Sequence, residues 1–436
     1  MLDEEIILIE DIPESERKVL LYYYHRLYSV ENDEGLEFDK NDRYYRTRLE
    51  QEEYQKEIRE DPDYEGEQDE VYDEEYDKFE YRVENGHVVY LCIGGNYFTG
   101  IPDFICNLTH LEYINLSCNM LTKLPECICN LKHLGHLFMP TNHLVILPKN
   151  IGTMENLREI YASGNNLKYL PESICDLKYL SNLNLSENRL THLPENIGNI
   201  KSLGVLKISN NNLTSLPESI CNLKNLRELY AYCNNITSIP KDIGNLKNLR
   251  DLRLSENKIT SIPESIGNLD RLEFLFLGDN QFVSIPESIG NLKSLNLFSA
   301  SENNLTSLPE SMKNLKNLHS LNLKHNPLKS FPLFLLDMKF ALYETKFLTP
   351  KGQKLRFRWD KKEFVKYYSK STVQLALQYI SDPKSLTEDE LERLIHEAGK
   401  NEKEILEAKL PPDDLILNKL IERDSQEISN GFKIYY

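Results

Sequence analysis

A period of 23 residues runs through the middle of the chain without a break. One asparagine marks each copy of the repeated unit, and a proline follows six residues later. The eleven asparagines are Asn96, Asn119, Asn142, Asn165, Asn188, Asn211, Asn234, Asn257, Asn280, Asn303 and Asn326. A short unit repeated in phase predicts a stacked array, because one unit cannot bury its own apolar residues and its neighbours must cover them.

Each unit combines a strand pattern with a turn pattern. Leu183 and Leu185 alternate with variable residues before Asn188, which is typical of a strand, and Leu190 and Leu193 follow it. These positions predict a parallel sheet on one side of the array and short 3₁₀ or extended turns on the other. An asparagine amide both donates and accepts hydrogen bonds, so we expect the repeated asparagines to form a buried ladder that satisfies the turn backbone.

The unit L-x-x-L-x-L-x-x-N-x-L, followed by Leu-Pro, resembles the leucine-rich-repeat superfamily. Within it, the 23-residue L-P-x-x-I class of intracellular Ras-scaffold and plant Ras-group-related proteins is the most similar. The resemblance implies an α/β solenoid, a horseshoe with a parallel concave β-sheet and about eleven repeats. It also implies that a protein partner docks on the concave face.

Charge and pattern divide the chain into three regions. Residues 1–86 hold 30 of the 69 acidic residues but 11 of the 51 basic ones, so they carry −19, while the remaining 39 acidic and 40 basic residues nearly cancel. We interpret 1–86 as an acidic, tyrosine-rich region, partly disordered, with a docking or capping helix over 14–30. Residues 87–337 form the solenoid. Residues 338–436 are predicted to be a C-terminal cap with a small helical region, including a helix that begins near Thr387.

Several features predict an intracellular, cytoplasmic location. The N-terminus lacks the basic segment of a signal peptide, and no apolar run approaches the ~20 residues of a membrane helix.

Of the eight cysteines, four share one repeat column with glycine, which small size explains: Cys106, Cys129, Cys175 and Cys221. The C-x-C pair of Cys127 and Cys129 is interpreted as having no metal or redox role. The acidic balance disfavours nucleic-acid binding, and we expect a monomer with no membrane contact.

Residues six, four and two positions before each asparagine face outward on the concave side, and several are aromatic. Exposed aromatics beside an arginine are typical of protein-binding hot spots. The predicted partner-binding residues are Tyr113, His136, Phe138, Tyr161, Lys207, Tyr230, Tyr232, Arg253, Phe274 and Phe276.

Catalytic motifs are absent from the sequence, so we predict a non-enzymatic interaction module or scaffold without cofactor or metal. His110 and His133, one repeat apart near Cys127, are interpreted as surface histidines. Two alternatives stay open. The acidic arm masks a basic surface, in which case added salt loosens it, or residues 338–436 carry an enzymatic activity that their deletion abolishes.

Overall fold

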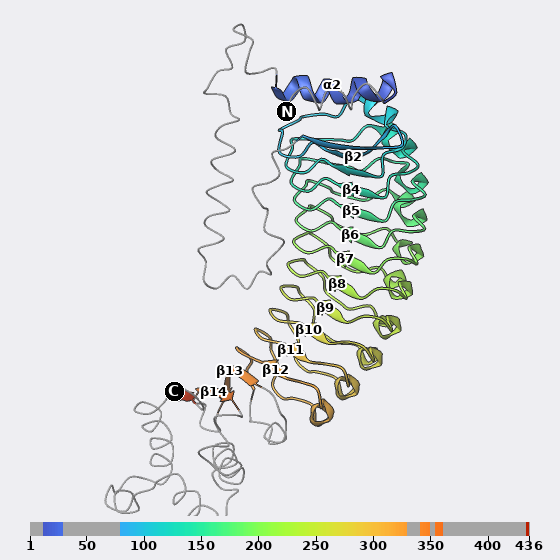
Figure 1. Cartoon of the computed structure of the whole chain (residues 1–436). Coiled ribbons are helices and arrows are strands. Elements are labelled where there is room, and N and C mark those ends of the chain that lie inside the picture. The colour runs from blue at the N-terminus through green and yellow to red at the C-terminus, as the bar shows by residue number, and fades with distance from the viewer. Residues whose placement is uncertain (1–11, 29–78, 329–340, 349–353, 361–432, 436) are drawn as a thin grey trace, which may run out of the picture.

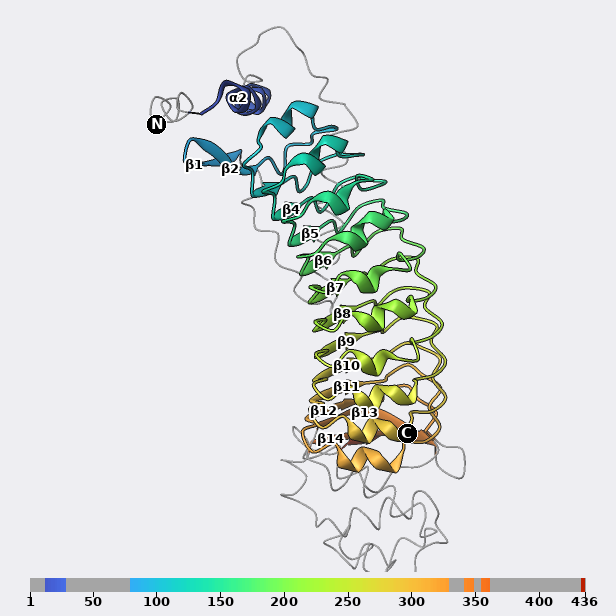
Figure 2. The ribbon, with the colours of Figure 1, turned by 90° about the vertical axis from the view of Figure 1, so that its right-hand side faces the viewer.

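The computed structural model describes residues 12–28, 79–328, 341–348, 354–360 and 433–435. Its described strands form one 15-stranded sheet in which neighbours along the chain are neighbours in space. Figure 1 shows the strands following one another along an open arc, with the turns on its outer side, and Figure 2 shows these turns from outside. The predicted α/β solenoid with a parallel concave sheet is confirmed.

Twelve strands of the sheet, β2 to β13, run parallel. From β2 to β12 each residue pairs with the residue one repeat further along the chain, as Tyr90 does with Tyr113, whereas Ser320 of β12 pairs with Ala341 of β13. The strands inside the repeats are β2 (His87–Cys92), β3 (Tyr113–Asn115), β4 (His136–Phe138), β5 (Glu159–Tyr161), β6 (Asn182–Asn184), β7 (Val205–Lys207), β8 (Glu228–Tyr230), β9 (Asp251–Arg253), β10 (Phe274–Phe276), β11 (Leu297–Ser299) and β12 (Ser320–Asn322).

Short 3₁₀ turns lie on the convex side, as the sequence predicts. Each has a proline, asparagine or aspartate at its N-terminal boundary. They are η3 (Asp103–Asn107), η4 (Glu126–Asn130), η5 (Ile151–Thr153), η6 (Glu172–Asp176), η7 (Ile197–Asn199), η8 (Glu218–Asn222), η9 (Ile243–Asn245), η10 (Glu264–Asn268), η11 (Glu287–Asn291) and η12 (Glu310–Asn314). Such turns are narrower than α-helices, so neighbouring coils splay little and the arc stays open.

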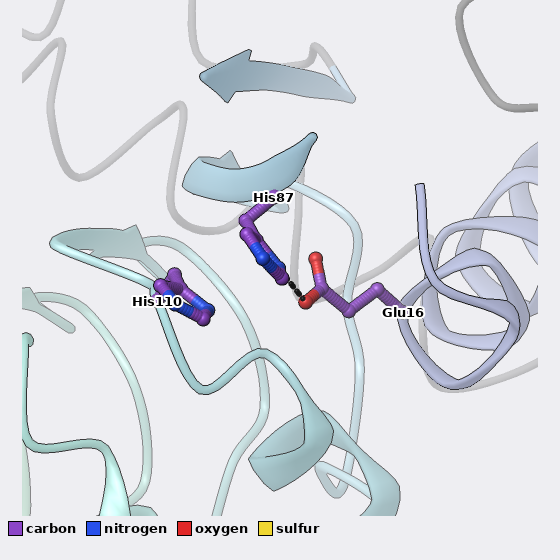
Figure 3. A group of neighbouring side chains, drawn as sticks. All are labelled: Glu16, His87 and His110. Carbon is purple, nitrogen blue, oxygen red and sulfur yellow. Dashed lines mark hydrogen bonds and ion pairs between the residues drawn. The ribbon is translucent and has the colours of Figure 1, made fainter. Parts of the chain in front are cut away.

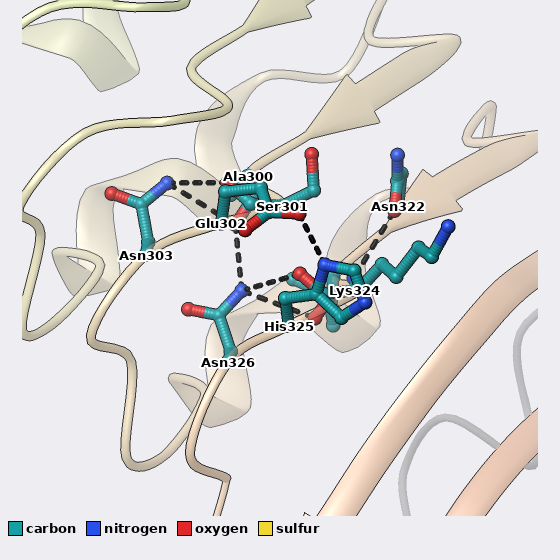
Figure 4. Close-up of polar contacts among 9 residues, drawn as sticks. Ala300, Ser301, Glu302, Asn303, Asn322, Lys324, His325 and Asn326 are labelled. Atoms are coloured by element: carbon teal, nitrogen blue, oxygen red, sulfur yellow. Dashed lines mark hydrogen bonds and ion pairs between the residues drawn. The ribbon is translucent and has the colours of Figure 1, made fainter. Parts of the chain in front are cut away.

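The repeated asparagines connect consecutive coils through their side-chain amides. Asn326 Nδ2 donates to the backbone oxygens of Ala300 and Leu323, at 2.7 and 3.0 Å, while its Oδ1 accepts the Leu305 N–H at 3.0 Å. Figure 4 shows this contact to Ala300, which Asn303 of the preceding coil also makes. The pattern recurs from Asn119 onward, whereas Asn96, at the N-terminal end of the array, is half-exposed and donates to the Gly94 oxygen of its own turn.

The residue before each ladder asparagine turns the chain in the left-handed region. From Cys118 to His325 every such residue has φ between 49° and 63°, and the glycines of this column are Gly95, with a φ of 70°, and Gly164. The left-handed conformation is costly for residues with a Cβ, so the ladder bonds of each coil compensate a repeated backbone strain.

The N-terminal end of the solenoid is covered by α2 (Glu14–Tyr28), which matches the helix expected over 14–30. Val19, Leu20 and Tyr23 are fully buried, and the Tyr23 ring lies 5.3 Å from that of Phe98 in the first coil. Figures 1 and 2 show α2 crossing the end of the array. The helix therefore closes the apolar end that stacking alone would leave open.

Additional strands extend the sheet at both ends. β1 (Glu80–Glu84) forms an antiparallel hairpin with β2, so residue 87 begins the second strand of that hairpin. At the other end β13 (Ala341–Leu348) pairs parallel with β12, followed by antiparallel β14 (Lys354–Asp360) and β15 (Lys433–Tyr435). The predicted helix near Thr387 lies outside the described residues.

Candidate protein-binding surface

Four rings from successive strands form a continuous stack on the concave face, which we name the aromatic row: Tyr90, Tyr113, Phe138 and Tyr161. Their ring centroids lie 4.7, 5.0 and 4.4 Å apart in that order, with interplanar angles of 28° or less. The parallel register brings equivalent positions one strand apart, and this spacing suits stacked rings. The core is complete without these rings, so they are available for another role.

Polar contacts hold the aromatic row in place. The Tyr161 hydroxyl accepts a hydrogen bond from Asn182 Nδ2 at 2.6 Å. His136 Nδ1 lies 3.0 Å from Glu159 Oε2, and the Arg82 guanidinium lies 5.8 Å from the centre of the Tyr90 ring. Rings held in this way lose little conformational freedom when they bind a partner.

A second group, the Arg253 cluster, lies on β7 to β10 and comprises Lys207, Tyr230, Asp251, Arg253 and Phe276. The Arg253 guanidinium carbon lies 4.6 Å from the Tyr230 ring centre and 4.8 Å from the Phe276 ring centre. Arg253 also donates to both carboxylate oxygens of Asp251, at 3.0 to 3.2 Å. The cation is therefore fixed between two rings by an ion pair.

Tyr230 differs from its prediction as an exposed contact residue. It is 7 % exposed, its hydroxyl donates to Asp251 Oδ2 at 3.1 Å, and Lys207 Nζ lies 5.0 Å from its ring centre. Residues on the neighbouring strands cover it from both sides, which strand alternation alone could not reveal. Within the Arg253 cluster, Tyr230 therefore holds Arg253 and Asp251 in position and has little surface of its own for a partner.

The other predicted concave residues are half-buried. Tyr113, His136, Phe138 and Tyr161 belong to or contact the aromatic row, while Lys207, Arg253 and Phe276 belong to the Arg253 cluster. Phe274 begins β10, and Tyr232 follows β8. Strand β6 separates the two groups, so the structure brings the predicted residues together as two patches.

One feature of the surface escaped the sequence analysis. A shallow groove of about 360 Å³ lies at the edge where β6 to β9 begin, lined by Arg227, Arg250 and Arg271 together with serine, asparagine and Gly204. A Cβ at Gly204 would stand 3.4 Å from an Arg227 nitrogen, so the glycine leaves room for that side chain. Arg227 and Arg250 occupy one repeat column, and this spacing is the signal that could have revealed the groove.

Six of the described cysteines are free thiols, and the other two form a disulfide. Burial raises the pKa of Cys129 and Cys221 to about 11 and that of Cys175 to about 12, so these thiols stay protonated and are poor nucleophiles. Cys106 and Cys127, however, form a disulfide between the first two convex turns. Small size is therefore not the whole explanation for Cys106, and the interpretation of Cys127 as having no redox role is wrong.

The histidines also lie closer together than predicted. The His110 ring stacks on that of His87 at 3.6 Å between centroids and is 5.5 Å from that of His133. His87 Nδ1 in turn lies 2.8 Å from Glu16 Oε1 on α2. Interpreting His110 and His133 as surface histidines did not include their neighbours His87 and Glu16, because α2 is far away in the sequence.

Leucine-rich-repeat family models match residues 87–144, 160–252 and 238–338. The chain belongs to the leucine-rich-repeat superfamily. Domains of this family generally mediate protein–protein interactions and are generally non-enzymatic. No curated protein matches the chain at a significant level.

Similar solved structures include two plant receptors. The Arabidopsis receptor kinase HAESA, in complex with the peptide hormone IDA and the co-receptor SERK1, shares 30 % identity over 61 % of this chain and 48 % of its own, with a TM-score of 0.54. The plant peptide hormone receptor RGFR1, in complex with RGF2, shares 29 % identity over 57 % of this chain and 46 % of its own, with a TM-score of 0.51. This chain thus spans about half the length of each.

A bacterial structure supports the fold alone. The functional domain of InlJ from Listeria monocytogenes is 23 % identical over 58 % of this chain and 53 % of its own, with a TM-score of 0.51. Within the described part of this chain, no helix is both long and apolar enough to cross a membrane.

Proposed function

We propose that this protein is a non-enzymatic interaction module or scaffold that binds a protein partner across the concave face, from the aromatic row to the Arg253 cluster. The observation that carries the proposal is the fixed arrangement of the Arg253 guanidinium between the Tyr230 and Phe276 rings. Core packing does not require these residues on the concave face. Aromatic and arginine side chains that are held rigid supply contact area at low entropic cost.

The two plant receptors give independent support. HAESA is in complex with the peptide hormone IDA and the peptide hormone receptor RGFR1 with RGF2, and both receptors resemble this chain over more than half its length. A protein or peptide segment lying along the concave face would contact both the aromatic row and the Arg253 cluster, which follow one another across β2 to β10. By resemblance we assign the chain to the 23-residue L-P-x-x-I class, acting as a monomer without nucleic acid or membrane contact.

The test begins with the partner. It is captured from lysate on the intact protein, purified, and its Kd is measured against single variants Phe138→Ala, Tyr161→Ala, Arg253→Ala and Phe276→Ala. At least one of these should weaken binding by ~2 kcal/mol or more, about 30-fold. Tyr169→Ala is the matched control, because Tyr169 is an exposed aromatic, at 46 %, beyond the concave strands.

Each variant is first checked for native unfolding behaviour. If all four concave variants bind within twofold of the unmodified protein, the concave-face proposal is wrong. If Tyr169→Ala weakens binding as strongly as they do, the contact lies on another face. Tyr230→Ala is left out of the decisive set, because its buried ring acts through Arg253.

We further propose the cytoplasm as the working location, and the cysteines provide the test. Disulfides are rare in reducing compartments. Of the eight cysteines, the structure leaves six free, so protein trapped with a thiol-blocking reagent in its own cells should carry eight blocked thiols in the cytoplasm but six in an oxidising compartment. Six would overturn the cytoplasmic assignment while leaving the binding proposal untouched.

A further inference from the structure

Three potential metal ligands from distant parts of the chain meet at the N-terminal end of the solenoid. Glu16 comes from α2, His87 begins β2, and His110 precedes β3. Their ligand atoms all lie within 4.8 Å of one another. Figure 3 shows the Glu16 carboxylate directed at the His87 ring, with the His110 ring stacked beside it.

The Glu16 carboxylate is deeply buried and already oriented. The residue is 2 % exposed, and its Oε2 accepts the Val88 N–H at 2.8 Å. Its Oε1 lies 2.8 Å from His87 Nδ1. A carboxylate withdrawn from water to this degree needs a nearby positive charge.

The two imidazoles bring further donor nitrogens close to this carboxylate. Their ring centroids are 3.6 Å apart at an interplanar angle of 20°. A divalent metal ion among these atoms would neutralise the buried carboxylate and bind the nitrogen lone pairs of the two rings.

We propose that Glu16, His87 and His110 bind one divalent transition-metal ion of the zinc class. Two histidines and one carboxylate are a common donor set for Zn²⁺, whereas Ca²⁺ and Mg²⁺ prefer oxygen ligands throughout. Ligand atoms around a tetrahedral Zn²⁺ lie about 3.3 Å apart, given bonds of about 2.0–2.2 Å. The His87 and His110 rings are stacked 20° from parallel, so binding requires them to turn until both nitrogen lone pairs point at the ion. Water fills the fourth position.

The ion would attach the covering helix to the array. Glu16 and His87 are 71 residues apart in sequence, and Leu20 and Tyr23 of the same helix pack onto the first coil. Because the ion binds only when α2 is packed on the first coil, metal binding stabilises this packed state by mass action. The site is therefore a structural one, fixing the N-terminal end of the solenoid independently of any partner on the concave face.

The test uses the full chain after removal of metal with a chelator. Isothermal titration with Zn²⁺ should reveal a site of one ion per chain, Co²⁺ should give the visible absorption of a tetrahedral complex, and Zn²⁺ should raise Tm by at least about 2 °C. Replacing a residue that only hydrogen-bonds to a metal ligand already lowers metal affinity by roughly 10–100-fold. His110→Gln and Glu16→Gln should each weaken this site at least about tenfold.

His110→Gln is the decisive variant, because it keeps the contact between Glu16 and His87 and so leaves the helix docked even where Glu16→Gln does not. His143→Gln is the matched control, an exposed histidine outside the group that should bind Zn²⁺ as the unmodified protein does. Absence of a stoichiometric Zn²⁺ site would overturn the proposal. So would Zn²⁺ affinity and Co²⁺ absorption that His110→Gln leaves unchanged, since the ion would then bind elsewhere.

Discussion

Each ladder asparagine satisfies several backbone groups that no strand partner reaches. Asn188 Nδ2 donates to the carbonyl oxygens of Ala162, Leu185 and Ser186 at 2.8 to 3.1 Å, and its Oδ1 accepts the Leu167 N–H at 2.9 Å. Two coils are therefore joined by one side chain that is 7 % exposed. A shorter or charged side chain cannot make all these contacts.

Asn188→Ala should lower the free energy of unfolding by at least about 2 kcal/mol, because each buried polar group left unpaired costs roughly 1–3 kcal/mol. Asn96→Ala is the matched control from the same column. Its half-exposed amide donates to the nearby Gly94 oxygen, so its loss should cost less than about 1 kcal/mol. Guanidinium chloride unfolding measures both, and equal losses would contradict the importance of the buried ladder.

Asp279 is one of three successive carboxylates in the left-handed column, between Glu256 and Glu302. Burial, followed by the charges of these two neighbours, raises its pKa. With the folded pKa above the unfolded one, the folded chain binds more protons in the interval between them. The stability that protonated Asp279 contributes is therefore lost as pH rises from its unfolded pKa through its folded pKa.

Asp279→Asn should stabilise the protein by roughly 0.5 kcal/mol at pH 7 and by little below pH ~4, where the unfolded carboxyl is also protonated. Asparagine also tolerates the φ of 49° at this position. Unfolding is followed at both pH values, with exposed Glu264→Gln as the charge-matched control. A variant less stable than the unmodified protein at pH 7 would show that Asp279 makes a favourable ionic contact.

At the scale of single elements, the convex turns alternate in length along much of the array. The five-residue turns η4, η6 and η8 carry cysteine in a column where the three-residue turns η5, η7 and η9 carry glycine. A Cβ on Gly198 would overlap the Ser219 carbonyl oxygen of the next turn. Glycine and cysteine are therefore not interchangeable here, although both are small.

Gly198→Ala should cost about 1–3 kcal/mol, the range for overpacking, because backbone rather than a flexible side chain blocks the added methyl. Cys175→Ala, in the same column, removes only a thiol and should stay within about 1 kcal/mol. Urea unfolding of the two variants under reducing and non-reducing conditions compares them directly. Equal tolerance would mean that the coils can separate locally at little cost.

At the scale of the whole molecule, each coil is stabilised by its neighbours, so the ends of the array need covering. At the N-terminal end α2 provides this cover, with Tyr22 4.9 Å from Phe104 between ring centroids. The disulfide between Cys106 and Cys127 joins the same first coils on the convex side. The helix therefore stabilises the first coils most directly.

Leu20→Ala should cost about 2–5 kcal/mol locally, because Leu20 is fully buried. Hydrogen–deuterium exchange should become faster in β2 and β3 while β9 is unchanged, since coupling passes only between adjacent coils. Lys18→Ala is the control, because its ion pair with Glu14 at 2.9 Å is exposed and contributes little. Faster exchange along the whole array would instead indicate a single cooperative unit.

The sequence predicts the repeating part of this molecule well, because period and residue type act locally in every coil. Strands, 3₁₀ turns and the helix over Glu14–Tyr28 all follow from such patterns. Contacts that depend on side-chain geometry between neighbouring coils do not, as the burial of Tyr230 against Arg253 and the Cys106–Cys127 disulfide show. The approach of Glu16 to His87 depends on two segments 71 residues apart, so it too appears only in the folded chain.

The parallel register also sets a length scale for anything that lies across the concave face. Strands in such a sheet repeat at about 4.8 Å, so two strand spacings span about 9.6 Å. A polyproline II segment has three residues per turn and advances about 3.1 Å per residue, so three residues span about 9.3 Å and bring a side chain back to the same face. A polyproline II segment crossing the strands at right angles therefore presents every third side chain to every second strand, so the array selects for periodicity in its partner. Peptides with aromatic anchors three residues apart should bind more tightly than peptides with the same anchors two apart, and equal affinities would exclude this crossing.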